Sequence, residues 1–211
     1  MAIKRTDESL ALRNNPKYKQ LIQAARELFI KHGFRRITID EICSKADVSK
    51  MTFYKFFKNK LDIFKSVMDE IVSETYLKFE TIMKEDSDFH EKMKQLLELK
   101  IKGNQDLGHE FIEEVLCSDN PEWLTYFHGV SNQAYQLNLQ FLEKGKTVGV
   151  IRRDLKPEFY NFMLGHLVQF IEDDHLKAIY PDIHDRIEEI TKFGFYGIFN
   201  TDELNGKEKP A

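Results

Sequence analysis

The stretch Thr38–Phe64, TIDEICSKADVSKMTFYKFFKNKLDIF, decides the fold of the first third of the chain. Thr38 followed three residues later by Glu41 is a capping-box pattern, which marks the start of a helix. Apolar residues then recur at helical spacing for about two turns. Asp47 interrupts this pattern with a residue that tolerates the left-handed backbone of a tight turn, and Ser49 can cap a second helix. The stretch therefore predicts two short helices joined by a tight turn.

The second of these predicted helices has an unusual surface. Phe53 and Phe57 lie one turn apart and can anchor one face to a core, while no carboxylate occurs between Val48 and Lys60. Such a helix suits a phosphate-lined groove of DNA. The alternative is a solvated basic face on a small helical domain. The hydrogen-bond donors offered between the anchors and beside them are Lys50, Thr52, Tyr54 and Lys55.

These residues resemble the helix-turn-helix of the TetR family of transcriptional regulators. The matching pattern is Val48-Ser49-x-x-Thr52-Phe53-Tyr54-x-x-Phe57-x-x-Lys60-x-x-Ile63, preceded by Ala24-Ala25-x-x-Leu28-Phe29-x-x-x-Gly33-Phe34. It covers about the first third of the chain. There are two departures from the family pattern: Asp47 replaces the usual Gly, and Met51 replaces a small residue or Pro.

The resemblance implies an all-α fold with an N-terminal three-helix helix-turn-helix domain. A long helix would join this domain to a C-terminal helical bundle for ligand binding and dimerisation. It implies a homodimeric repressor that binds a palindromic operator in double-stranded DNA and is released by a small-molecule effector. The matched positions imply contacts near base edges from Lys50, Met51, Thr52 and Lys55, and phosphate contacts from Thr38, Ser49, Tyr54 and Lys60.

Charge is divided unevenly along the chain. The net charge of the chain is −4. Residues 1–60 carry 14 Lys or Arg and 6 Asp or Glu, whereas the remaining residues carry 17 Lys or Arg and 29 Asp or Glu. A basic head ahead of an acidic body is expected for a protein whose head binds a polyanion. The low content of Gly and Pro and the scarcity of alternating patterns favour an all-helical chain.

Four segments are expected along the chain. They are a flexible basic arm, a helix-turn-helix domain, a helical ligand-binding and dimerisation domain, and a polar tail, at residues 1–14, 15–62, 63–200 and 201–211. In the arm, Lys4, Arg5 and Arg13 are candidates for minor-groove contacts, and an unstructured terminus is the alternative.

Caps, prolines and glycines mark the expected helix ends. Asn15-Pro16 begins the first helix and Gly33 ends it. A long helix after Asn59 continues to Lys84 and connects the head to the body. The body is expected to contain a helix that ends at Gly103-Asn104, a helix from Asn120-Pro121 to Gly145, and helices that begin at Pro157 and Pro181. Gly165, Gly194 and Gly197 in the last two helices favour close helix packing, either within the chain or in a dimer.

An effector site in the body would be lined by its aromatic side chains, because ligand pockets are mostly apolar with a few polar groups. Glu113 and Glu172 lie near the same segments, so we expect a hydrophobic or cationic effector. For each residue, the alternative is an ordinary place in the core or on the surface. The candidate lining residues are Phe111, Trp123, Phe127, Phe141, Phe162, His166 and Phe170.

The sequence carries no catalytic pattern. His109-Glu110-x-x-Glu113 lacks the second His of a zincin motif, and no Gly-x-Ser-x-Gly elbow occurs. We therefore expect no enzyme, cofactor or metal site. The alternative function is a ligand-binding or scaffolding protein that keeps a vestigial helix-turn-helix.

Cysteine use and hydropathy suggest the compartment. Cys43 and Cys117 lie far apart on apolar stripes, which argues against a structural disulfide and leaves a redox role for Cys117 as an alternative. No apolar run approaches the ~18 residues of a membrane span. A cytoplasmic protein without membrane contact is expected.

Overall fold

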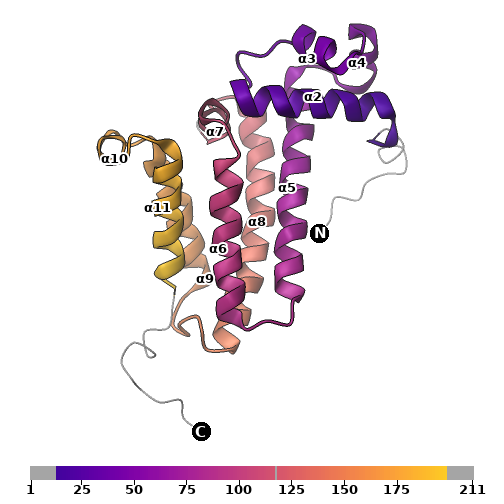
Figure 1. The fold of residues 1–211 in the computed structure, drawn as a ribbon. Coiled ribbons are helices and arrows are strands. Elements are labelled where there is room, and N and C mark those ends of the chain that lie inside the picture. The colour runs from indigo at the N-terminus through magenta and orange to yellow at the C-terminus, as the bar shows by residue number, and fades with distance from the viewer. Residues whose placement is uncertain (1–12, 117, 199–211) are drawn as a thin grey trace. The chain divides into compact units, whose positions relative to one another are not determined.

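The computed structural model describes residues 13–116 and 118–198, and these residues form helices without a strand. The predicted all-α fold is confirmed. In chain order the helices are α2 (Pro16–His32), α3 (Ile39–Ala46), α4 (Lys50–Phe56), α5 (Lys60–Lys84), α6 (Phe89–Gln105), α7 (His109–Leu116), α8 (Pro121–Thr147), α9 (Pro157–Gln169), the 3₁₀ turn η1 (Phe170–Glu172), α10 (Asp174–Ile179) and α11 (Ile183–Tyr196) (Figure 1).

The helices gather into two compact units. Among the described residues, the first consists of those up to Glu74 together with those of Leu107–Leu124, so it contains α2, α3, α4, α7 and the beginnings of α5 and α8. The second consists of Thr75–Asp106 and the described residues from Thr125 onward. Sequence reasoning did not anticipate that α7 and the start of α8 belong with the helix-turn-helix helices. The functional boundaries expected after residues 14, 62 and 200 stay a prediction.

The predicted ends of the N-terminal helices are confirmed. The Asn15 side chain accepts the N–H of Lys17 at 2.9 Å, and Gly33 ends α2 with φ 76°. Thr38 and Glu41 form the capping box at the start of α3. Asp47 ends α3 in the left-handed conformation, with φ 51° and ψ 48°. The helix after Asn59 ends at Lys84, as expected.

Three expected helix boundaries in the body were wrong. The last helix, α11, begins at Ile183 and not at Pro181. The helix α6 passes Gly103-Asn104 and ends at Gln105, and α8 passes Gly145 and ends at Thr147. Gly149, with φ 81°, supplies the left-handed turn after α8 instead. The short α10 was missed, because six residues are too few to produce a clear apolar period.

The core of the first unit is built around the ring of Phe64. Its centroid lies 5.2 Å from that of Phe29 and 4.6 Å from that of Phe34. From the other side, Phe111 of α7 lies at 5.7 Å and Trp123 of α8 at 4.9 Å. Each buried aromatic of this kind contributes about 1.5–3 kcal/mol by burial alone. The cluster therefore joins α2, α5, α7 and α8 at one point.

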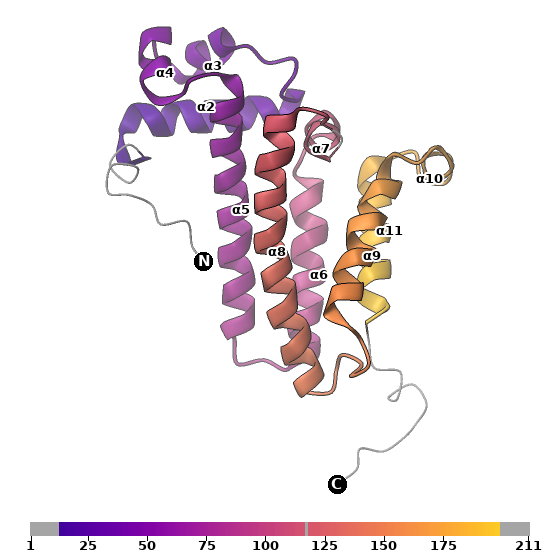
Figure 2. The same ribbon diagram turned by 180° about the vertical axis from the view of Figure 1, so that it is seen from behind.

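The second unit has its own core between α6, α8 and α11. Phe89 stacks on Phe141 with centroids 5.1 Å apart, and Phe195 of α11 belongs to the same buried cluster. Tyr160 of α9 packs against this cluster, and burial raises the pKa of its hydroxyl to about 12. In both views α9 and α11 lie side by side (Figures 1 and 2).

Two glycines of α8 have opposite surroundings. A Cβ on Gly145 would collide with the Ile151 side chain and lie 2.7 Å from Cε1 of Phe89, whereas a Cβ on Gly129 would have no neighbour within 4 Å. Gly145 therefore has a close-packing role within α8 and not the helix-ending role expected from the sequence.

Substituting these glycines should change stability in opposite directions. Gly145→Ala should destabilise the protein by about 1–3 kcal/mol through overpacking. Gly129→Ala should stabilise it by up to about 1 kcal/mol, because Ala is the better helix former. Urea unfolding of both variants measures the difference, and equal effects would contradict the packing role of Gly145.

Candidate nucleic-acid interface

The short helix α4 is anchored by one face. Phe53 and Phe57 are buried, with ring centroids 5.5 Å apart, and Tyr18 of α2 lies 5.2 Å from Phe57. The Ser49 hydroxyl accepts the N–H of Thr52 at 3.2 Å and caps the helix. A helix of 7 residues is marginal by itself in water, so these contacts hold it in place.

The opposite face of α4 is open to solvent. Met51 is 76% exposed and Tyr54 is 56% exposed, and Lys55 is exposed as well. Together with Lys50 these residues present one large apolar side chain, one phenol and two ammonium groups on neighbouring turns. The face therefore combines cations that can bind phosphate with an apolar group that can contact a base edge.

One cation of this face already has a partner. The Lys50 ammonium lies 2.6 Å from a carboxylate oxygen of Asp40 on α3, and both side chains are largely exposed. An exposed pair of this kind contributes only about 0.2–1 kcal/mol. A phosphate can therefore compete for Lys50. Although α4 itself contains no carboxylate, Asp40 of α3 supplies one to this surface.

Two of the predicted phosphate ligands are helix caps. The Thr38 hydroxyl donates to the Glu41 carboxylate at 2.8 Å and accepts the Glu41 N–H, and the Ser49 hydroxyl lies 3.0 Å from that of Thr52. Hydrogen bonds from Thr38, the backbone N–H first, hold the pKa of the Glu41 carboxyl below its ordinary value. Because this pKa is lowered, the cap is present above the ordinary Glu pKa and is lost as the pH falls.

The structure gives Lys60 a different use from the phosphate contact implied by the family pattern. Its ammonium donates to the carbonyl oxygens of Phe34 at 2.7 Å, Arg35 at 3.1 Å and Ile37 at 2.7 Å, and lies 4.4 Å from the centre of the Phe34 ring. Burial lowers the pKa of this ammonium, and the nearby carboxylates of Glu114 and Glu41 oppose that shift. Three carbonyl oxygens use the three donors of an ammonium.

Lys60 and Lys55 should therefore affect different measurements. Lys60→Met should lower the free energy of unfolding by about 1–3 kcal/mol, because it leaves carbonyl groups without a donor. Lys55→Met should leave stability within about 0.5 kcal/mol and flatten the salt dependence of DNA binding by about one unit. Urea unfolding and binding titrations at several salt concentrations separate the two. A flatter salt slope with unchanged stability for Lys60→Met would contradict the structural role and show that Lys60 binds phosphate.

Some candidate residues lie away from α4 or outside the described residues. Arg13 donates to Asp69 of α5 at 3.4 Å. Lys4, Arg5 and Cys117 lie outside the described residues. Cys43 is buried in α3, and burial raises the pKa of its thiol, which disfavours the reactive thiolate.

The candidate effector residues are divided between the two units. Phe111 and Trp123 belong to the first unit, where they are buried against Phe64, and the Trp123 indole N–H donates to the Val115 carbonyl at 3.0 Å. The other five belong to the second unit. There Phe141 is in the core, Phe127 is half-buried, Phe162 and His166 are exposed with ring centroids 4.3 Å apart, and Phe170 is exposed. Their role in effector binding stays a prediction.

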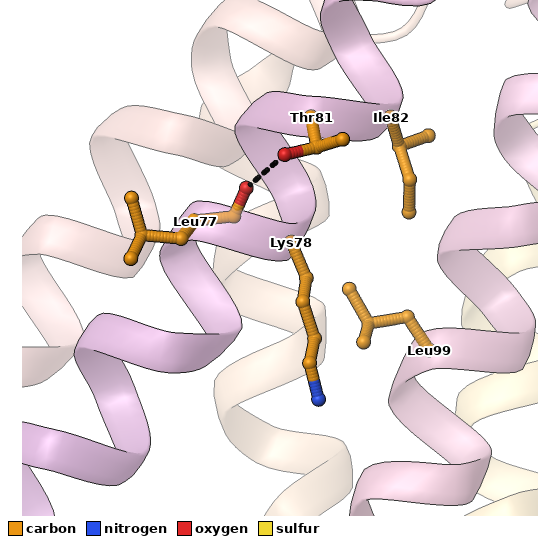
Figure 3. A pocket seen from close by; sticks show the side chains of 5 residues that line it. All are labelled: Leu77, Lys78, Thr81, Ile82 and Leu99. Carbon is orange, nitrogen blue, oxygen red and sulfur yellow. Dashed lines mark hydrogen bonds between the residues drawn. The ribbon is translucent and has the colours of Figure 1, made fainter.

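The second unit carries a shallow apolar groove of about 360 Å³. Leu77, Lys78, Thr81 and Ile82 of α5 line it opposite Leu99 of α6, and the Thr81 hydroxyl donates to the Leu77 carbonyl at 2.9 Å (Figure 3).

Within the described residues, no group of three or more His, Cys, Asp or Glu side chains is placed to hold a metal ion. Among the helices of residues 13–116 and 118–198, none is long and apolar enough to cross a membrane.

Comparisons with known proteins agree with this geometry. Residues 21–67 match the family model of the bacterial regulatory proteins of the tetR family. An uncharacterised helix-turn-helix transcriptional regulator of Bacillus subtilis, YhgD, is 28% identical over 51% of this chain and 63% of its own length. The fatty acid metabolism regulator protein of the same organism is 35% identical over 37% of this chain and 40% of its own length. The chain thus spans less than two thirds of either relative.

The similarity of fold extends over most of the chain. The fatty acid degradation regulator FadR of Bacillus halodurans superposes with a TM-score of 0.68 at 23% identity, covering 87% of this chain and 97% of that one. The class defined by fold and surface is an all-helical protein with an N-terminal helix-turn-helix. Its residues 21–67 match the helix-turn-helix domain of the tetR family of bacterial regulatory proteins, and most of the chain shares the fold of the FadR structure.

Proposed function

We propose that the protein is a homodimeric repressor that binds a palindromic DNA operator through α4 and is released by a small-molecule effector. The observation that carries the proposal is the open face of α4, with exposed Met51, Tyr54 and Lys55 opposite the buried anchors Phe53 and Phe57. In a helix-turn-helix the second helix enters the major groove and its first residues contact base edges. Lys50, Met51, Thr52 and Lys55 are the proposed residues near the bases.

The proposed phosphate contacts frame this helix. Ser49 is the N-cap of α4, Tyr54 is exposed on α4 itself, and Thr38 is exposed at the start of α3. Lys60 is a further proposed phosphate contact, and its ammonium also donates to three backbone carbonyl groups. The basic balance of residues 1–60 supports the proposal, because phosphate contacts dominate the affinity of such proteins for DNA.

Dimerisation is proposed through α9 and α11. Phe159 and Phe162 of α9 are 52% and 61% exposed, and Phe193 and Tyr196 of α11 are 67% and 61% exposed. Each pair is three residues apart, so its members share one face of their helix. An apolar surface of this kind on adjacent helices indicates a protein–protein interface. A two-fold dimer would place two α4 helices in major grooves separated by one turn of DNA or a multiple of it.

Replacing Phe162 tests this interface. Phe162→Glu should place a charge in the proposed interface, shift the protein from dimer to monomer, and weaken operator binding at least tenfold. The matched control is Leu77→Glu on α5, since Leu77 is 63% exposed. Sedimentation velocity measures the oligomeric state. Dissociation caused by Leu77→Glu, or an intact dimer with Phe162→Glu, would reject α9 as an interface element.

The effector is proposed to bind the C-terminal helices and to act by differential affinity for two arrangements of the heads. A ligand shifts such an equilibrium only by the difference between its affinities for the two states. The continuous helix α5, which starts in the first unit and ends in the second, is the proposed connection. Two similar proteins are regulators of fatty acid metabolism and fatty acid degradation, so fatty acyl compounds are tested beside cationic compounds as effector classes.

A gel-shift titration with the DNA upstream of the protein's own gene tests the function. We expect a saturable protein–DNA complex that persists in the presence of competitor DNA of random sequence. Addition of the correct effector class should dissociate this complex. A protein with a vestigial helix-turn-helix would show equal affinity for both DNAs while a ligand still raised its melting temperature. That result would establish the alternative, a ligand-binding or scaffolding protein.

A further inference from the structure

The carboxylate of Glu114 on α7 binds the backbone between α2 and α3. It accepts the N–H of Phe34 and, at 2.9 Å, the N–H of Arg35. Two successive backbone N–H groups that point to one anion form a small anion-binding concavity. Hydrogen bonds to a charged acceptor are about twice as strong as neutral ones. The side chain of one helix thus fixes the conformation of the segment that leads into the helix-turn-helix.

Two glycines allow α7 to approach this segment. A Cβ on Gly33 would lie 3.0 Å from Oε2 of Glu114 and 3.1 Å from Cβ of Glu110, and φ of 76° already disfavours other residues there. The N–H of Gly108 donates to the Ile30 carbonyl at 3.1 Å, and a Cβ on Gly108 would overlap that same oxygen. Gly33 therefore has a second role beside ending α2: it leaves space for α7.

The same segment is held from its other side by Lys60. The ammonium of Lys60 binds the carbonyl groups of Phe34, Arg35 and Ile37, while Glu114 binds the N–H groups of Phe34 and Arg35. The carbonyl groups of residues 34, 35 and 37 are thus bound by a cation from α5, and the N–H groups of residues 34 and 35 are bound by an anion from α7. The next residue, Thr38, is the cap of α3, and α3 leads through the Asp47 turn into α4.

We propose that Glu114 is a positioning residue for DNA binding: it fixes residues 34–37 and through them the start of α3 and the orientation of α4. The proposal rests on the proposed function for its DNA-binding consequence. The new element is that α7 determines operator affinity, although the proposed function assigns no DNA contact to α7. In the chain, α7 follows α6, which belongs to the second unit, and precedes α8, which begins in the first unit and continues in the second.

Glu113 provides a matched control on the same helix. It is exposed, and its carboxylate lies 3.9 Å from the Nδ1 atom of His109. Removing either carboxylate changes the net charge equally. If charge alone mattered, both substitutions would strengthen DNA binding slightly, because each removes a repulsion from the phosphates. Positioning predicts the opposite sign for Glu114 only.

The experiment compares Glu114→Ala, Glu114→Gln and Glu113→Ala in operator binding and in amide hydrogen exchange of the free full-length protein. We expect Glu114→Ala to weaken binding about tenfold or more, Glu114→Gln to weaken it less, and Glu113→Ala to stay within about twofold of the unmodified protein. Exchange should accelerate at Phe34 and Arg35, and at Ile42, whose N–H makes the first bond of α3 to Thr38.

Each outcome decides the proposal. Equal or tighter binding by Glu114→Ala, or unchanged exchange at Phe34 and Ile42, would overturn it. If Glu114→Ala does not fold, Glu114→Gln is judged by the same two criteria. If the unmodified protein does not bind its upstream DNA, the proposed function fails. The exchange rates at Phe34, Arg35 and Ile42 then decide alone whether Glu114 positions α3.

Discussion

The packing of the first compact unit depends on the ring of Phe64. Four other aromatic rings lie within 5.7 Å of its centre, and they come from α2, the following loop, α7 and α8. Because such clusters are close-packed, a change at one ring is felt by the others. Phe64 therefore places α7 beside the end of α2, where Glu114 can reach the backbone of Phe34 and Arg35.

Apolar and polar contacts have separate roles in this unit. The aromatic cluster and the buried anchors Phe53 and Phe57 hold the helices together, whereas Lys60 and Glu114 fix the backbone between α2 and α3. The outer face of α4 contributes to neither set, which leaves Met51, Tyr54 and Lys55 available to a ligand. The proposed DNA reading surface is thus positioned by residues that lie outside the outer face of α4.

The sequence predicted local features well and long-range ones poorly. The Thr38 capping box, the left-handed Asp47 and the end of α5 at Lys84 all depend on residues within a few positions of each other. The pairing of Lys50 with Asp40, the three carbonyl partners of Lys60 and the binding of residues 34–35 by Glu114 depend on which helices meet, and no local pattern encodes that. Gly145 was misinterpreted for the same reason: its packing against Ile151 and Phe89 is not visible in the sequence.

The most direct test of the central claim, that the outer face of α4 meets DNA, is site-specific photo-cross-linking. A photoreactive amino acid replaces Met51, Tyr54 or, as a control, Ile179, which is 67% exposed on α10. In complexes with the upstream DNA, the account predicts cross-links from positions 51 and 54 and none from position 179. A complex that forms but cross-links from neither 51 nor 54, or equally from 179, would contradict it.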